Sequence, residues 1–417
     1  MKRAAAWLLL LPLLSGSAQA AVVSEDALAG DSLTLGASAR SYNLVLRGGP
    51  LASPPSPAGF DPAGVSSLYL RPRLELKRGF GLDFVVHDEL ASTTSSVPTG
   101  AIGGALSLGQ GRTAPVWLPL QWSLAERDTY QLQDRIAWLY ARYHVGRLSV
   151  TLGRQPVTLG RGQIWTPEDL IAPFSPLQID TEFKPGADAM RLDWDASEAF
   201  SLLLVGAAAK HGDSALLARA ELRGERVRLG LMLGDVRQDG VAGLDLFVDL
   251  GSGTDLHGEG TLTWVPKAER RPWGRRGFSR AVLGTTTELT SKLHLTAEAA
   301  FNGAGARGPE DYVSELSSRR LALGEAYNVG RVYAGLAADW QLHPLVGLAL
   351  SALSNLQDPS AILAPGLHYS IAENASLVAG AFIPLGQGPR YSTTGIRARS
   401  EFGLYPQIYH VDAKLWL

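Results

Sequence analysis

Arginine and carboxylate side chains alternate with leucine in parts of this 417-residue chain. Residues 68–77 read Leu-Tyr-Leu-Arg-Pro-Arg-Leu-Glu-Leu-Lys, which places Arg71, Arg73 and Glu75 on one side of an extended segment. A guanidinium group stays charged and offers paired N–H donors that match the two oxygens of a carboxylate or phosphate. Such side chains suit the binding of small oxyanions, and they equally suit pairing with one another.

The segments that carry these residues alternate apolar and polar side chains with the two-residue period of β-strands. Apolar and polar residues alternate in 147–153, 218–223, 244–250 and 293–301 as they do in 68–77, and about 18 such segments fill the chain. A soluble β-sandwich buries the apolar faces, whereas a membrane barrel turns them toward lipid around a polar interior. Alternation by itself leaves both architectures open.

Connection lengths separate the two architectures. The connections after even-numbered segments are tight turns, such as those at 224–225 and 251–253. Transmembrane barrels combine short periplasmic turns with long external loops, and an even strand number places both termini on one side. We therefore predict an all-β fold, an antiparallel up-and-down transmembrane barrel of about 18 strands. The long connections all follow odd-numbered segments, at 47–65, 91–131, 156–187, 266–277, 303–328 and 385–406.

The first residues predict export. Lys2 and Arg3 precede an apolar run and a small-residue site that ends at Ala20, which is the pattern of a secretory signal peptide. The apolar run is shorter than the roughly 20 residues that a membrane-spanning helix needs. We expect a signal peptide at 1–20, one barrel at 21–417 and a location in the bacterial outer membrane.

Composition excludes several classes of protein. The chain has no cysteine, so it has neither a disulfide framework nor a cysteine for lipid attachment. Its net charge of −2 argues against a general nucleic-acid binder. A zinc site is not expected either, because the eight histidines are scattered and no cysteine supports them.

One stretch is more distinctive than the rest. A strand ends in Gly-Arg-Gln at 153–155, a long loop follows, and the chain re-enters a strand through Gly-Ala-Asp-Ala-Met-Arg at 186–191. Over residues 132–195 this arrangement resembles the alginate-export-type outer-membrane porins, a family of 18-stranded barrels. The resemblance implies a narrow lumen that is lined with arginines and partly closed by inward-folded loops. It also leaves polysaccharide export open as a role.

The expected pore-lining residues follow from the resemblance and from strand parity. The lumen should also contain carboxylates such as Asp245, Glu259 and Glu298, which oppose strict anion selectivity. Facing arginines and carboxylates can also brace a wet barrel interior without touching a solute, so the sequence leaves both roles open. The residues expected to line the pore are Arg71, Arg73, Glu75, Arg142, Arg154, Asp188, Arg191 and Arg219.

The loop at 156–187 is the expected constriction. It contains five prolines and the apolar residues Trp165, Leu170, Ile171 and Phe174, which are unfavourable to expose to water. A loop of this length and composition is predicted to fold into the lumen or to pack over it. An external cap that contacts no solute is the alternative.

Two other functions use the same fold. An outer-membrane hydrolase would need a triad, for which the candidates are His87 with Asp88, and His211 with Asp213 and Ser214. Neither lies in a nucleophile elbow, so we expect no enzyme. Passive diffusion through a barrel needs no cofactor, and no metal is expected. A structural or adhesive barrel with a plugged lumen remains open, because it predicts the same strands.

The expected partners follow from this reading. They are outer-membrane lipid, a small polar or anionic solute, and the barrel-assembly machinery, which would bind the C-terminal strand at 408–417. The basic segment from Lys267 to Arg276 lies in a loop of external parity and is predicted either to bind lipopolysaccharide phosphates or to be plain solvated surface. No nucleic acid is expected.

Overall fold

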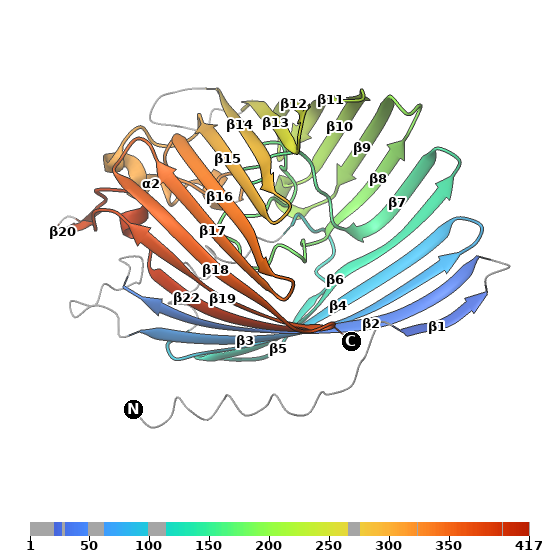
Figure 1. Ribbon diagram of the computed structural model, residues 1–417, viewed down its shortest axis with the longest axis horizontal. Helices are drawn as coiled ribbons and strands as arrows, with labels where there is room; N and C mark the ends of the chain where they lie inside the picture. Colours follow the sequence, from blue (N-terminus) through green and yellow to red (C-terminus); the bar gives the residue numbers. More distant parts are fainter. Residues whose placement is uncertain are drawn as a thin grey trace.

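Eighteen antiparallel strands form one closed barrel in the computed structural model of this chain, which describes residues 21–26, 30–48, 62–98, 114–265, 276–322, 324–393 and 395–416 (Figure 1). Each strand pairs with two neighbours, and β2 closes the ring by pairing with both β3 and β22. The predicted fold class and strand number are confirmed. The barrel strands are β2 (Asp31–Arg47), β3 (Ala63–Arg78), β4 (Leu82–Ser95), β6 (Tyr130–Val145), β7 (Leu148–Gln155), β8 (Ala187–Trp194), β9 (Phe200–Ala207), β10 (Ala215–Arg223), β11 (Val227–Val236), β12 (Asp239–Gly251), β13 (Thr254–Trp264), β14 (Gly277–Thr290), β15 (Leu293–Asn302), β16 (Val332–His343), β17 (Val346–Asn355), β18 (Ser360–Ala372), β19 (Ala375–Leu385) and β22 (Gln407–Trp416).

Four shorter strands lie outside this ring, and the sequence did not predict them. Strand β1 (Ala21–Asp26) pairs with the first residues of β2, which extend past the C-terminal end of β22. Strand β5 (Gln121–Arg127) pairs with β6 beyond the end of β7. Strands β20 (Arg390–Ser392) and β21 (Gly395–Arg397) form a separate hairpin.

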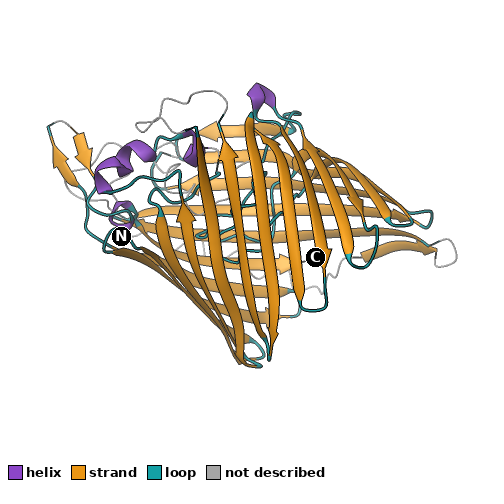
Figure 2. Ribbon diagram, turned by 90° about the horizontal axis from the view of Figure 1, so that it is seen from above, coloured by secondary structure: helices purple, strands orange, loops and turns teal. Residues whose placement is uncertain are grey.

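The two ends of the barrel differ as the connection lengths predict. At one end the strands are joined by short turns, such as the one between β10 and β11. At the other end lie the long connections (Figure 2). They carry the helical turns η1 (Lys210–Gly212), η2 (Pro309–Asp311), α2 (Tyr312–Glu315), α3 (Arg319–Ala322) and η3 (Phe402–Leu404).

None of the helices described here is long and apolar enough to cross a membrane.

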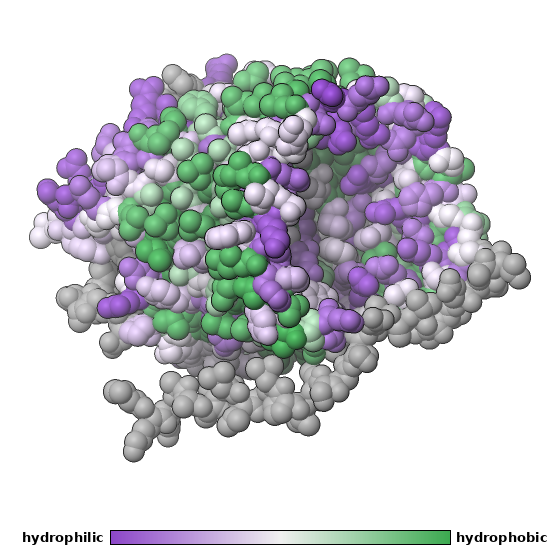
Figure 3. Space-filling view, in the orientation of Figure 1, coloured by the Kyte–Doolittle hydropathy of each residue, from purple (hydrophilic) through white to green (hydrophobic). Residues whose placement is uncertain are grey.

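The strand faces are those of a membrane barrel. Leu152 and Leu216 on the outside are 63% and 67% exposed, whereas Asp245 on the inside is fully buried. In Figure 3, hydrophobic residues cover much of the left side, and hydrophilic residues gather along the hollowed side to the right. Trp138 lies inside the lumen, where its ring stacks on His87 with the ring centroids 4.2 Å apart. Five other aromatic residues of the strands are exposed, as residues at a membrane interface are: Tyr143, Trp194, Trp264, Trp340 and Tyr409.

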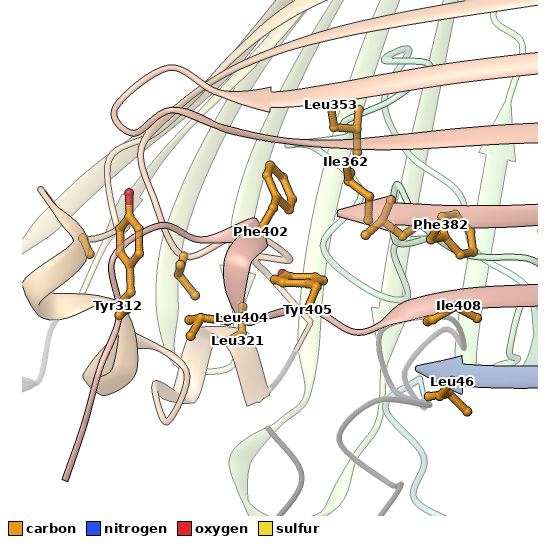
Figure 4. Close-up of a cluster of buried hydrophobic side chains, with 14 of the residues drawn as sticks. Leu46, Tyr312, Leu321, Leu353, Ile362, Phe382, Phe402, Leu404, Tyr405 and Ile408 are labelled. Carbon is orange, nitrogen blue, oxygen red and sulfur yellow. The ribbon is translucent and has the colours of Figure 1, made fainter. Parts of the chain in front are cut away.

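Apolar side chains from two external loops pack at the mouth of the barrel. Phe402 and Leu404 of η3 lie with Tyr312 of α2 against Leu353 and Ile362 of the barrel wall (Figure 4). The carboxylate of the neighbouring Glu401 anchors this cluster. It accepts hydrogen bonds from the Tyr333 hydroxyl at 2.6 Å, the Asn355 amide at 2.7 Å and the Asn328 amide at 3.1 Å.

A second apolar cluster shows where the loop between β7 and β8 runs. Its residues Val157, Leu159, Leu170 and Ile171 are buried against inward-facing side chains of β8, β9, β10, β11 and β12. These strands form one wall of the barrel. The loop at 156–186 therefore folds into the lumen, and the prediction that it does so is confirmed.

Candidate pore constriction

The wall formed by β10, β12, β13 and β15 is acidic, and it binds the backbone of the inward loop. Glu259 of β13 accepts hydrogen bonds from the backbone N–H groups of Arg161, Gly162 and Glu168, the last two at 3.0 Å. We call this the acidic wall. Its inward carboxylates are Glu221, Asp245, Glu259 and Glu298.

Glu298 of β15 binds the next three residues of the loop in the same way. Its two carboxylate oxygens accept from the backbone N–H groups of Gln163 at 2.6 Å, Ile164 at 3.1 Å and Trp165 at 3.0 Å. The His257 Nε2 atom lies 3.0 Å from the same carboxylate. A segment without regular secondary structure thus has its backbone donors satisfied by the barrel wall.

Two arginines near the acidic wall, Arg161 and Arg219, are paired with its carboxylates. The Arg161 side chain binds Glu221 at 2.7 Å and also binds Asp245. Arg219 of β10 binds the same two carboxylates at 2.8 Å and 2.7 Å. Arg219 was a predicted pore-lining residue, and the structure places it in this cluster, beside the loop.

Glu168 is the unusual carboxyl group of the loop. Its side chain is fully buried, and neither carboxylate oxygen has a hydrogen-bond partner among the described residues. Burial, and then the charges of Asp245 and Glu259, raise the pKa of Glu168 to about 9. The group is therefore neutral at physiological pH, which allows it to lie against an acidic surface.

The opposite wall, formed by β22, β2, β3, β4 and β6, binds the loop mainly through cationic side chains, although its own carboxylates Asp412 and Glu89 pair with Arg40 and Arg71. Asp180 of the loop accepts from Arg40 of β2 at 2.7 Å and from Arg71 of β3 at 3.0 Å. Burial alone would raise the pKa of Asp180, but Arg71 and Arg40 outweigh it and hold the pKa below its usual value. We call this the basic wall, and its inward cations near the loop are Arg40, Arg71, Arg135 and Lys414.

Arg71 lies at the centre of the basic wall. Its guanidinium binds Glu89 at 2.6 Å and lies 4.2 Å from the centre of the Phe183 ring. Its Nη1 atom is buried and has no hydrogen-bond partner within the described part of the chain. Glu182 of the loop pairs with Lys414 of β22. The loop thus reaches from the acidic wall to the basic wall and narrows the lumen between them.

Four other predicted residues lie in the lumen on the short-turn side of the loop. Arg73 approaches Glu75 at 3.6 Å and is 41% exposed along its side chain. Arg142 donates to the Thr151 hydroxyl at 3.1 Å, and Arg191 binds its neighbour Asp193 at 2.8 Å. A cavity of about 240 Å³ borders this region, and its lining includes Arg161, Arg191, Arg219, Glu221 and Arg223.

Arg154 and Asp188 lie elsewhere. They pair with each other at 2.7 Å, and Arg154 is in register with Leu139, which faces outward. Asp188 accepts from the backbone N–H groups of Trp117 at 2.9 Å and Leu118 at 2.8 Å. The pair fastens the segment before β5 to the barrel rim, so this placement gives no support to a pore-lining role.

Several residues of the constriction were missed by sequence reasoning. Arg40 and Lys414 lie on predicted strands, where their inward parity was available as a signal. Arg161, Asp180 and Glu182 lie in a loop, where no period marks which side chains turn toward a wall.

The structure gives little support to the alternative catalytic and metal sites. His87 is buried against Trp138, and a β-bulge separates its register from that of Asp88. The side chain of His211 lies outside what the structure describes, as do residues 1–20 and all but the last residue of the basic segment 267–276. In the described ranges, no group of three or more histidine, aspartate or glutamate side chains could hold a metal ion.

Comparisons with known proteins support the fold. No family model and no curated protein matches the chain. Acinetobacter baumannii OccAB1 superposes with a TM-score of 0.55 at 8% identity, over 92% of this chain and 96% of that one. Pseudomonas aeruginosa OccK5 (OpdH) and P. aeruginosa OpdK, solved with vanillate, each give a TM-score of 0.54 at 10% identity, over 92% of this chain and 98% of theirs.

These similarities show the fold and no more than the fold. The chain has the 18-stranded architecture of the Occ and Opd outer-membrane porins, and the expected outer-membrane location agrees with that architecture. The comparisons do not show membership of the alginate-export family.

Proposed function

We propose that this chain is an outer-membrane channel through which small polar or anionic solutes diffuse passively. The observation that carries the proposal is the pairing of Asp180 with both Arg40 and Arg71 in the lumen. These guanidinium groups hold a carboxylate that belongs to the protein. A carboxylate that belongs to a solute has the same chemistry and can be held in the same way.

The distribution of charge supports an anion route along the basic wall. On the acidic wall, Glu259 and Glu298 are bound by backbone N–H groups, and Asp245 is bound by Arg161 and Arg219. These contacts occupy the acceptor oxygens of the acidic wall with groups of the protein itself. On the basic wall, the buried Arg71 Nη1 remains a donor without an acceptor among the described residues.

The solved neighbours agree with this chemistry. The OpdK structure was determined with vanillate, which carries a carboxylate. We propose the same class of solute for this chain, namely small molecules with at least one carboxylate or phosphate group. Export of a polysaccharide is a narrower form of the proposal, which the alginate-export resemblance suggests.

The expected cellular context belongs to the same proposal. A signal peptide at 1–20 would be cleaved after export, and β22 would be read by the barrel-assembly machinery. Lipid and lipopolysaccharide would surround the exposed leucines of the barrel. Heat-modifiable migration of the protein in an outer-membrane fraction would support this context, and recovery as a soluble periplasmic protein would contradict it.

The deciding experiment is a single-channel recording of the refolded protein in a planar bilayer under a salt gradient. We expect stable open steps and a reversal potential on the anion side. Vanillate and short uronic-acid oligomers, added in turn, should block the current if they enter the constriction. Silence in a sample whose folding is verified would contradict the proposal and favour a plugged structural barrel.

A further inference from the structure

We propose that Glu259 and Glu298 are positioning residues that set the width of the channel by clamping the backbone of the inward loop. The inference deepens the proposed function, because it assigns the pore width to two carboxylates that touch no solute. Together they accept six backbone N–H groups, from residues 161, 162 and 168 and from residues 163–165. We call this arrangement the amide clamp.

The local chain geometry is built for this contact. At Gly160, φ is +86°, and a Cβ atom would lie 2.5 Å from Oε2 of Glu259. At Gly162, a Cβ atom would lie 1.8 Å from the carbonyl oxygen of Trp165. Glycine at 160 avoids both the strain and the overlap with Glu259, so it lets the backbone approach the wall closely, and glycine at 162 lets the loop fold back on Trp165.

The clamp is held from the wall side as well. His257 contacts Glu298 through Nε2 at 3.0 Å and Asp255 through Nδ1 at 2.8 Å, which fixes the position of the carboxylate. On β16, a Cβ atom at Gly335 would lie 2.8 Å from the Trp165 ring and from Cδ1 of Ile164. The absence of a side chain at Gly335 therefore leaves space on the wall for the side chains of Ile164 and Trp165.

Backbone donors make this contact independent of the loop's side chains. Hydrogen bonds that involve a charged group are roughly twice as strong as neutral ones. Replacing a clamp carboxylate with an amide would remove the charge and present an N–H donor to other donors. We therefore expect the loop to leave the wall in such variants and the pore to widen.

Labelling of a unique cysteine tests the clamp without depending on conduction. The chain has no cysteine, so Ile164→Cys gives a single thiol at the clamp. In the full-length protein refolded in lipid, we expect E298Q and E259Q to accelerate its reaction with a maleimide by about tenfold or more, because local opening exposes the site. The double variant should react faster still.

Two controls separate loop release from other effects. Asp249 lies on the same wall with inward parity, and its side chain accepts from the Gly251 N–H. Among the described residues it makes no hydrogen bond or ion pair with the loop, so D249N removes a like charge without touching the clamp. Ala398→Cys places the thiol in the buried cluster at the barrel mouth, where a general loss of packing would speed its reaction with the maleimide. We expect no acceleration in either control.

The width itself is measured by polymer exclusion in planar bilayers. E298Q and E259Q should admit larger polyethylene glycols than the parent, whereas D249N should not. Folded E298Q and E259Q proteins that label at the parental rate and exclude the same polymers would overturn the clamp. If every variant is silent in bilayers but labelling accelerates as expected, the clamp stands and the channel proposal fails.

Discussion

The acidic and basic walls hold the same loop by different means. Glu259 and Glu298 bind its backbone, whereas Arg40 and Arg71 bind one of its side chains, Asp180. Contacts to backbone N–H groups fix the path of the chain. Contacts between side chains leave the wall able to exchange one carboxylate for another. Under the proposed function, the acidic wall positions the loop and the basic wall selects the solute.

The largest expected effect comes from removing the carboxylate that occupies the basic wall. In Asp180→Asn, Arg40 and Arg71 lose their shared counter-ion, so the potential at the constriction becomes more positive. We expect the reversal potential to move toward anions, with the permeability ratio rising by roughly tenfold at low salt. D249N on the acidic wall is the matched control, since it removes one negative charge away from the loop. Equal shifts in the two variants would remove the distinction between the walls.

The next largest effect is a shift of the reversal potential toward cations. It tests whether two of the predicted arginines, Arg71 and Arg191, contribute differently to ion preference. Arg71→Gln leaves the buried Glu89 and Asp180 with fewer partners, so we expect a shift toward cations of about threefold to tenfold. Arg191→Gln should shift the preference less, because Arg191 is paired with Asp193 on the short-turn side of the loop. Both are measured as reversal potentials under one salt gradient. An unchanged potential in Arg71→Gln would refute the anion route along the basic wall.

The strands and the long loops were predictable because their signals are periodic. Alternation places Arg71 and Arg219 inward, and the structure agrees for both. The length and apolar composition of the loop at 156–187 predict that it folds into the lumen or packs over it, and the burial of Val157 and Leu170 shows that it folds in. Strand β5 was not predicted, because it is short and pairs with β6 only beyond the end of β7.

The rest of the site was not predictable because it depends on long-range contacts. Asp180 meets Arg40 across 140 residues of sequence, and no local pattern records that contact. The amide clamp is also invisible in the sequence, since it uses backbone atoms that every residue has. The pore-lining role of Arg154 was expected from the resemblance, whereas strand alternation places this residue on the same side as the outward-facing Leu152.

A smaller effect is the dependence of the loop on pH. The pKa of Glu168 is raised to about 9 by burial and by Asp245 and Glu259. A raised pKa means that the group stabilises the folded loop fully below its ordinary pKa, and that this stabilisation is lost as the pH rises through about 9. Maleimide labelling at Ile164→Cys should therefore accelerate between pH 7 and pH 10, measured relative to Ala398→Cys to correct for thiol ionisation. Glu168→Gln, a neutral isostere, should abolish the relative acceleration, and a pH response that persists in Glu168→Gln would exclude this group as its cause.

The smallest expected effect on selectivity is that of Arg154, although this residue shares its type with Arg71. Arg154 binds Asp188, and Asp188 in turn holds the backbone of residues 117 and 118 at the rim. Arg154→Gln should leave the reversal potential unchanged, because the guanidinium has the register of the outward-facing Leu139. It should lower the temperature of heat-modifiable unfolding, since loss of a buried charged partner is destabilising by about 1–3 kcal/mol. A shift toward cations as large as that of Arg71→Gln would place Arg154 in the ion path and contradict the outward register of the pair. A lowered unfolding temperature with an unchanged potential would show that two arginines of one predicted set serve different parts of the barrel, one the rim and the other the pore.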